Sequence, residues 1–107
     1  MTSQVLKLVF FVPASHVEVV KAAVFAAGAG RQGYYEHCCW QVLGQGQFRP
    51  MTGSSPFLGE LGNLASVAEY RVELLCPADR ASAVKAALVA AHPFEEPAYE
   101  FLPLVQI

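Results

Sequence analysis

Two short segments of the chain carry side chains whose types and spacing could do chemistry, and the first is His37-Cys38-Cys39. If this segment is a strand, alternation places His37 and Cys39 on one face, with Cys38 and Trp40 on the other. An imidazole and a thiolate on one face suit a divalent transition metal such as zinc or copper. Two other interpretations stay open, because a buried strand favours cysteine for packing alone and a thiol can also act in redox chemistry.

The second segment is His92-Pro93-Phe94-Glu95-Glu96-Pro97, in which two prolines hold an imidazole and two carboxylates close together. These groups could bind a metal or another cation, or act as an acid–base pair. Glu95 and Glu96 could equally have a structural role, by capping a neighbouring helix or pairing with Arg31. The sequence has no G-x-S-x-G, H-E-x-x-H or paired C-x-x-C motif and nothing that resembles a Ser-His-Asp arrangement, so it indicates no common hydrolase.

An internal repeat indicates which elements position these segments. The sequence repeats at a constant offset and without a gap. The stretch Val20-Lys21-Ala22-Ala23 recurs as Val84-Lys85-Ala86-Ala87, and Tyr35-Glu36 recurs at the same offset as Tyr99-Glu100. Each half is predicted to be strand, helix, strand, which is the β-α-β-β-α-β order of the ferredoxin-like fold, of the α+β class. The expected strands cover residues 6–12, 34–43, 70–76 and 98–105.

The helix signals lie between these strands. Ser15 with Glu18 fits a capping box, and Asp79 is the matching N-cap in the second half. Gly28 is predicted to end the first helix in the left-handed conformation, with His92 in the same place in the second half. Apolar residues at helical spacing give each helix one buried face: Val17, Val20, Val24 and Ala27, then Ala81, Val84, Leu88 and Ala91.

Both helices should then cover one face of an antiparallel sheet and leave the other face bare. The expected strand order is 4-1-3-2, which places the second and fourth strands at opposite edges. Within one chain, His37 and the acidic loop at Glu95 and Glu96 should therefore lie far apart. They could form one site only where the edge strands of neighbouring subunits meet.

The connection over residues 44–68 is far longer than a hairpin loop requires, and long loops in compact domains are usually functional or disordered. Its five glycines and two prolines are interleaved with large apolar side chains: Phe48, Met51, Phe57 and Leu58. We expect an ordered excursion that packs these side chains on itself or on a neighbour. Gly44-Gln45-Gly46 opens no helix and is not a phosphate-binding fingerprint.

Composition limits the partners of the chain. Its 107 residues make one domain, over residues 1–107, and the net charge of −2 with only 7 Lys and Arg argues against a nucleic-acid partner. Nothing resembles a signal peptide or an apolar membrane span, and three cysteines suit reduced thiols in the cytoplasm. Hydrophobic residues make 54% and charged residues 15%, which indicates a subunit interface.

Several stretches of the sequence resemble the YqfO family, which is often named after a yeast NGG-interacting factor. They are Gly28 to Trp40, Gly44 to Pro50, Pro56 to Glu60 and His92 to Tyr99. More narrowly, the chain is similar to the domain inserted in those proteins, which resembles the CutA and PII trimers. The family's dinuclear metal site belongs to a flanking domain that this sequence lacks, so the hydrolase label is not expected to apply. Phe94 also stands where the motif usually has Tyr.

The resemblance implies a homotrimer whose sheets face inward, and it places the 44–68 excursion where PII-like proteins carry a ligand-responsive loop. The candidate metal ligands are His37, Cys39, His92, Glu95 and Glu96, for a divalent transition metal. The candidate ligand-binding residues are Arg31, Tyr35, Cys38, Trp40, Phe48 and Arg49.

Two functions from different classes compete. The first is a non-catalytic CutA/PII-like binding or regulatory module for a small ligand, a metal ion or a protein partner. The alternative is a small metal-dependent enzyme whose active site lies at subunit junctions and uses His37, His92, Glu95 and Glu96. A structural subunit of another protein is a third interpretation. No nucleic acid or membrane is expected as a partner.

Overall fold

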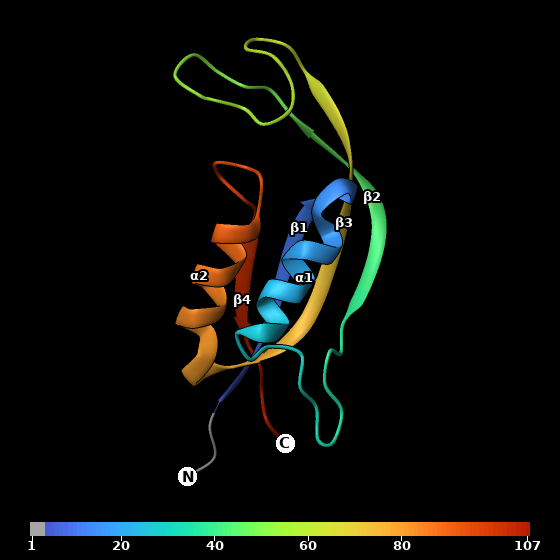
Figure 1. Ribbon diagram of the computed structural model, residues 1–107, viewed down its shortest axis with the longest axis vertical. Coiled ribbons are helices and arrows are strands. Elements are labelled where there is room, and N and C mark those ends of the chain that lie inside the picture. Colours follow the sequence, from blue (N-terminus) through green and yellow to red (C-terminus); the bar gives the residue numbers. More distant parts are fainter. Residues whose placement is uncertain (1–3) are drawn as a thin grey trace.

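The computed structural model describes residues 4–107 and has two layers, a four-stranded sheet and a pair of helices (Figure 1). The elements in chain order are β1 (Val5–Pro13), α1 (Val17–Ala26), β2 (Trp40–Phe48), β3 (Ala65–Pro77), α2 (Ala81–Ala91) and β4 (Tyr99–Pro103). Short 3-10 turns, Ala14–His16 and Ala78–Arg80, precede the helices. The order matches the predicted β-α-β-β-α-β pattern.

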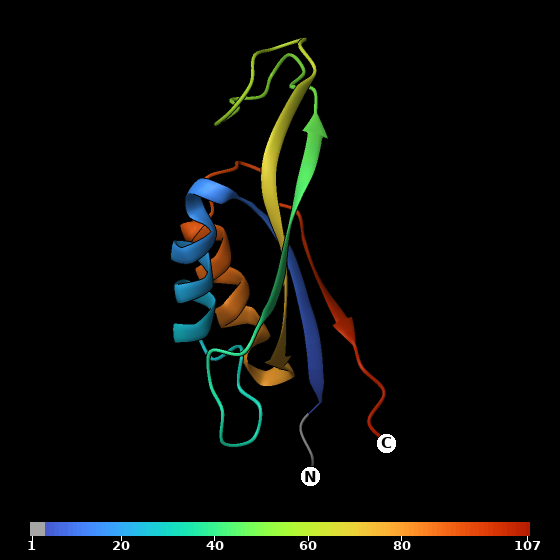
Figure 2. The same cartoon turned by 90° about the vertical axis from the view of Figure 1, so that its right-hand side faces the viewer.

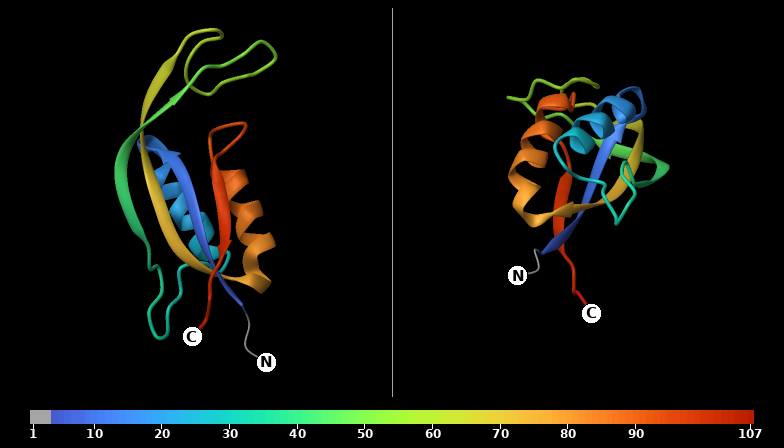
Figure 3. Two further views of the ribbon diagram at one scale, coloured as in Figure 1. Left: turned by 180° about the vertical axis from the view of Figure 1, so that it is seen from behind. Right: turned by 60° about the horizontal axis from the view of Figure 1, so that its bottom comes forward.

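The sheet order is β2-β3-β1-β4 and every neighbouring pair is antiparallel, which confirms the predicted order and fold class. Both helices lie on one side of the sheet, and the other side is uncovered in one chain (Figure 2; Figure 3, left). One row of paired residues crosses all four strands on that uncovered side: Trp40, Glu73, Val9 and Glu100.

The core lies between the sheet and the helices. Leu8, Phe10 and Val12 of β1 face the helices and are fully buried, as are Val20 of α1 and Val84 of α2. Full burial of each such side chain contributes about 1.5–3 kcal/mol of hydrophobic stabilisation. The predicted helix faces are therefore confirmed, with their valine and leucine positions inside and their alanines at the margin of the core.

The predicted N-terminal caps of the helices are wrong. Within residues 4–107 no side chain caps the N-terminus of either helix. The Ser15 hydroxyl instead bonds the Nδ1 atom of His16 at 2.8 Å, and Asp79 lies inside the second 3-10 turn. The reason is that the chain enters each helix through a 3-10 turn that directly follows a proline. The helices therefore begin one residue later than a cap at Ser15 or Asp79 would require.

The end of α1 follows the prediction and the end of α2 does not. Gly28 has φ +117° and its N–H donates to the Phe25 carbonyl at 3.1 Å, so it supplies the left-handed residue. Arg80 closes this end further, because its Nε donates to the Ala27 carbonyl at 3.1 Å. His92, by contrast, has φ −76° and ψ 136°, which is extended. A residue that precedes a proline is driven to this region.

The internal repeat holds for part of each half. β1 and β3 end at Pro13 and Pro77, the 3-10 turns match, and the helices begin at Val17 and Ala81, all with the offset seen in the sequence. The closing strands break the repeat, since β4 begins at Tyr99 whereas β2 begins only at Trp40. The predicted strand over residues 34–43 is therefore wrong in its first six residues, which form a loop, because the connection after α1 is longer than the one after α2.

The two ends of the 44–68 connection extend β2 and β3 as a hairpin, and its middle is irregular. β2 continues to Phe48 and β3 begins at Ala65, so only residues 49–64 are irregular. This β2–β3 hairpin extends past the helices and contributes to a long molecule, with extents of 50 × 24 × 24 Å. Neither helix of the described residues has the length and apolar character needed to cross a bilayer.

Candidate functional site

The sequence-predicted site residues separate into two groups at opposite ends of the molecule. One group lies at the lower end in Figures 1 and 2, in the loop between α1 and β2 and the first residue of β2, and contains Arg31, Tyr35, His37, Cys38, Cys39 and Trp40. The other group lies at the upper end, where the β2–β3 hairpin meets the loop after α2, and contains Phe48, Arg49, His92, Glu95 and Glu96. Within one chain the two groups are therefore well separated, as the strand order predicts.

The lower loop is held by backbone hydrogen bonds at its base. The Gly30 N–H donates to the Leu75 carbonyl of β3, and the Cys38 N–H donates to the Gly30 carbonyl, both at 2.8 Å. A bridge between Gln32 and Tyr35 closes the tip. The loop thus has a fixed base and an exposed tip, at which the Tyr35 side chain is 76% exposed.

His37 lies in this loop and not in a strand, so the prediction that it shares a strand face with Cys39 is wrong. Its φ of +59° is a left-handed conformation that an alternating strand does not contain. Its ring stacks on the Phe25 ring, with centroids 4.8 Å apart and an interplanar angle of 10°. The imidazole is exposed, Cys39 is exposed and Cys38 is half-buried.

His92 is buried and both of its ring nitrogens have hydrogen-bond partners. The Phe94 N–H donates to Nδ1 at 3.1 Å, so the ring proton lies on Nε2, which donates to the Phe11 carbonyl at 2.7 Å. Burial lowers the pKa of His92, which favours the neutral ring that this pattern requires. His92 therefore fixes the loop after α2 against β1, and it could bind a metal only by giving up one of these bonds.

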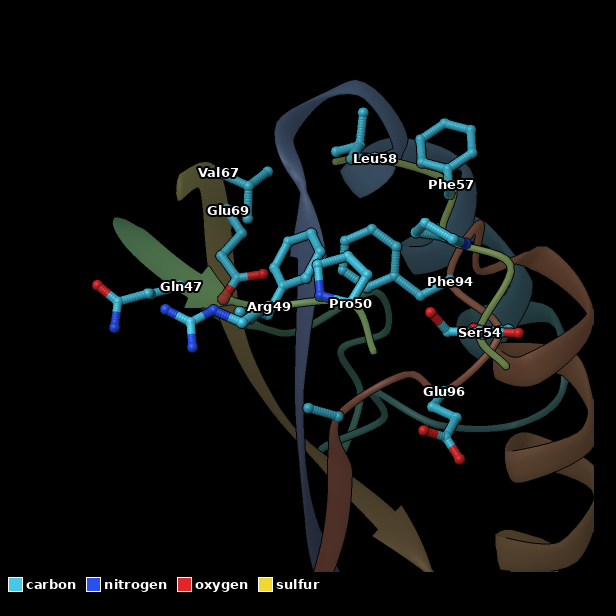
Figure 4. A pocket seen from close by; sticks show the side chains of 14 residues that line it. Gln47, Arg49, Pro50, Ser54, Phe57, Leu58, Val67, Glu69, Phe94 and Glu96 are labelled. Carbon is cyan, nitrogen blue, oxygen red and sulfur yellow. The ribbon is translucent and has the colours of Figure 1, made fainter. Parts of the chain in front are cut away.

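A pocket lies at the upper end, between the β2–β3 hairpin and the loop after α2 (Figure 4). Its volume is about 350 Å³. Its apolar wall contains three aromatic rings, with the Phe94 ring 6.2 Å from Phe48 and 6.3 Å from Phe57. Phe57 also meets His16 edge-on, at 5.4 Å between centroids. The excursion thus packs Phe48 and Phe57 on its own chain, as predicted, whereas Met51 is 74% exposed and does not pack.

Polar groups complete the pocket. Arg49, Ser54, Glu69, Glu95 and Glu96 are among the lining residues. The Ser55 N–H donates to Glu95 Oε1 at 2.9 Å, which ties the excursion to the loop after α2. Within one chain the predicted pairing of these acids with Arg31 does not form, because Arg31 lies in the loop between α1 and β2, at the other end of the molecule.

Glu69 is a pocket residue that the sequence did not single out. It belongs to β3, it is half-buried, and burial raises the pKa of its carboxyl group. Among residues 4–107 it makes no hydrogen bond through its side chain and no ion pair. The only signal in the sequence is Gly46, whose missing side chain leaves the space that the Glu69 carboxylate occupies. Phe57 and Phe94 also line the pocket and were not proposed as ligand-binding residues.

The metal candidates do not gather in one chain. In the described part of the chain, no three His, Cys, Asp or Glu side chains lie close enough to hold a metal ion. A metal site built from His37, Cys39 and the acidic loop therefore needs a neighbouring subunit and stays a prediction.

No family model matches the sequence, but curated relatives do. A protein named GTP cyclohydrolase 1 type 2 homolog, from Mycobacterium leprae strain TN, is 52% identical over 99 residues, which cover 92% of this chain and 26% of that protein. The protein of the same name from Bacillus subtilis strain 168 is 42% identical over 105 residues, which cover 98% and 28%. The chain spans about a quarter of the length of the curated relatives it matches.

Solved structures similar to this chain include a protein related to NIF3 and several CutA proteins. A Bacillus cereus protein related to NIF3 has a TM-score of 0.85 and 40% identity, over 99% of this chain and 27% of that one. CutA1 from Shewanella sp. SIB1 has a TM-score of 0.69 and 14% identity, over 99% and 86%. The CutA divalent cation tolerance protein of Archaeoglobus fulgidus has a TM-score of 0.68 and 12% identity, over 95% and 85%. This chain therefore has the fold of the CutA proteins, and its sequence is similar to about a quarter of the proteins named GTP cyclohydrolase 1 type 2 homolog.

Proposed function

We propose that this chain is a trimeric, non-catalytic binding module of the CutA/PII type, related to the CutA-like segment of the YqfO family and working in the cytoplasm. Its ligand is a small molecule that binds in the pocket between the β2–β3 hairpin and the loop after α2. The single observation that carries this proposal is the pocket itself, which combines an aromatic wall with a few polar groups. Small-molecule sites in proteins have this character and a volume of about 300–1,000 Å³.

The structure of the pocket favours binding over catalysis. An acid–base pair needs two titratable groups that can exchange protons with a substrate. His92 is committed through both nitrogens to the backbone, and Glu95 accepts the Ser55 N–H. Those two groups stabilise the pocket walls, which is a structural role. The activity in the name of the relatives is therefore not part of the proposal.

The uncovered sheet face supports the trimer. Large apolar side chains are exposed on it at both edge strands: Trp40 at 57% and Val42 at 44% on β2, and Leu102 at 42% on β4. A patch of this kind across one sheet face is typical of a subunit interface. Edge strands at β2 and β4 also have unpaired backbone groups, which neighbouring subunits could satisfy in a closed ring.

The test of the proposed function is a fragment screen by ligand-observed NMR on the purified chain. We expect hits whose binding is lost in Ala98→Trp, because a tryptophan at this lining position fills the pocket. Ala86→Trp, on the outer face of α2, is the matched control and should keep the hits. Hits that bind equally well to both variants, or a screen without hits, would contradict a ligand site in this pocket.

A further inference from the structure

We infer that the pocket selects a small organic cation, with an apolar or aromatic body and a protonated amine or amidine that the Glu69 carboxylate binds. This inference rests on the proposed function, since it names the ligand class of the same pocket. It follows from three features of the pocket: the sign of its charge, the position of Glu69 and the aromatic rings.

The charged groups of the pocket are mainly acidic. Three carboxylates line it, from Glu69, Glu95 and Glu96, against the single guanidinium of Arg49. Among the described residues none of these four forms an ion pair with another residue of the chain. Glu95 accepts the Ser55 N–H, whereas the Glu69 side chain has no hydrogen-bond partner within residues 4–107. A half-buried carboxylate without a partner favours a ligand that brings positive charge.

The position of Glu69 depends on a glycine in the neighbouring strand. A Cβ atom added at Gly46 would overlap the Glu69 carboxylate, so an alanine there would displace the end of the Glu69 side chain. Gly44 lies on the same strand directly opposite Glu69, yet a Cβ added there would meet only the Glu69 carbonyl oxygen, at 4.0 Å. Comparing an alanine at Gly46 with an alanine at Gly44 therefore distinguishes the displacement of the Glu69 carboxylate from the general effect of replacing a glycine in this strand.

The aromatic rings give the cation a second kind of contact. Phe48 and Phe57 both approach Phe94, and all three line the same pocket as Glu69 (Figure 4). The faces of aromatic rings attract cations, and the attraction is stronger where water is excluded. Rings and carboxylate together discriminate against an anion of the same shape, because the anion would meet like charge at Glu69.

Three probes of nearly equal shape test the charge. Benzamidine is a cation, benzamide is neutral and benzoate is an anion, and each can be titrated into the full chain by isothermal calorimetry or ligand-observed NMR. We expect benzamidine to bind about tenfold more tightly than benzamide, as one charge-assisted hydrogen bond allows. Benzoate should not bind measurably. Equal affinities for the three probes, or tighter binding of benzoate, would overturn the inference.

Paired variants test the site. Glu69→Gln should remove the preference for benzamidine over benzamide, whereas Glu36→Gln, with the same change of net charge in the lower loop, should keep it. Gly46→Ala should weaken benzamidine binding by displacing the Glu69 carboxylate, and Gly44→Ala should not. If Glu69→Gln and Glu36→Gln behave alike, Glu69 does not bind the cation and the inference is wrong.

The outcomes separate the inference from the proposed function. If benzamide binds as well as benzamidine and Ala98→Trp abolishes both, the pocket is a ligand site but does not select cations. If neither probe binds and the fragment screen finds nothing in the pocket, the proposed function fails as well. The absence of any ligand in the pocket would also result if a neighbouring chain of the trimer filled the pocket. A crystal structure of the trimer would show such a chain.

Discussion

The Nε2–H of His92 donates a hydrogen bond to the backbone carbonyl of Phe11 at 2.7 Å, across 81 residues of sequence. The same ring accepts the Phe94 N–H through Nδ1. One buried imidazole thus joins the end of α2, the strand β1 and the loop that forms one wall of the pocket.

We predict that His92→Phe destabilises the chain although the ring volume is nearly kept. The variant leaves the Phe11 carbonyl and the Phe94 N–H without their partner, at a cost of about 1–3 kcal/mol for each group that water cannot reach. Urea denaturation at pH 8 measures the loss. His37→Asn is the control and should cost much less, because that ring is exposed and asparagine tolerates the positive φ of this position.

The stabilising effect of His92 should depend on pH. Burial lowers the pKa of its imidazole in the folded chain, so the unfolded chain binds the proton more readily. The stability of the parent chain should therefore fall as the pH drops below about 6.5, the usual pKa of the unfolded state. His92→Phe lacks this loss, so the difference between the two proteins should shrink from pH 8 to pH 5. A constant difference would contradict the hydrogen-bonded neutral ring.

Glu69→Gln should stabilise the chain near pH 7 in the absence of ligand. Burial raises the pKa of the Glu69 carboxyl group, so its ionisation costs more in the folded than in the unfolded chain. The cost appears as the pH rises through the unfolded pKa of about 4.3 and is complete above the folded pKa. The advantage of the variant should thus vanish near pH 3. Thermal unfolding measures it, with Glu36→Gln in the exposed lower loop as the matched control.

Val20→Asp and Val84→Asp should each prevent folding. Both valines are fully buried between the helices and the sheet, and an unpaired charge there has no compensating partner. Lys85→Ala should be nearly neutral, since Lys85 is exposed. Lys21→Ala should cost more than about 0.3–0.5 kcal/mol, the usual value for its helical ion pair with Glu18 at 3.1 Å, because the Lys21 side chain is only 15% exposed and its stem is lost as well. Circular dichroism and urea denaturation separate these outcomes.

The proposed trimer should depend on the uncovered sheet face and not on the helices. Val42→Lys and Leu102→Lys introduce charge on that face at the two edge strands, and we expect them to shift the chain from trimer to monomer. Val89→Lys places the same charge on α2 at a comparable exposure of 43% and should stay trimeric. Light scattering at micromolar concentration reports the mass. A parent chain that is monomeric would refute the trimer.

A metal site shared between subunits stays a separate prediction. If His37 of one subunit meets Glu95, Glu96 or His92 of a neighbour, the distance between their side chains in the trimer should be under about 10 Å, since metal–ligand bonds are near 2 Å. His37→Ala and Glu95→Ala should then cause the same loss of zinc binding, and the double variant should add little. Additive losses, or a larger distance, would exclude the shared site.

The sequence by itself determined the elements and their order. Pro13 and Pro77 end strands because they lack an N–H, Gly28 ends a helix because it adopts positive φ, and valines at helical spacing mark the buried faces. These signals are local, or repeat along the chain, and can be recognised without knowing the tertiary contacts between residues. The strand order followed from them, because few arrangements connect such elements.

The tertiary structure alone decided which of the candidate residues share one pocket. The length of the connection after α1 removed His37 and Cys39 from the strand that the repeat assigned to them. The pocket depends on contacts between distant residues, such as Ser55 with Glu95 and Phe48 with Phe94. Glu69 became a candidate only when β2 placed Gly46 beside it. Such contacts arise from the register and bend of a hairpin, which no local pattern encodes.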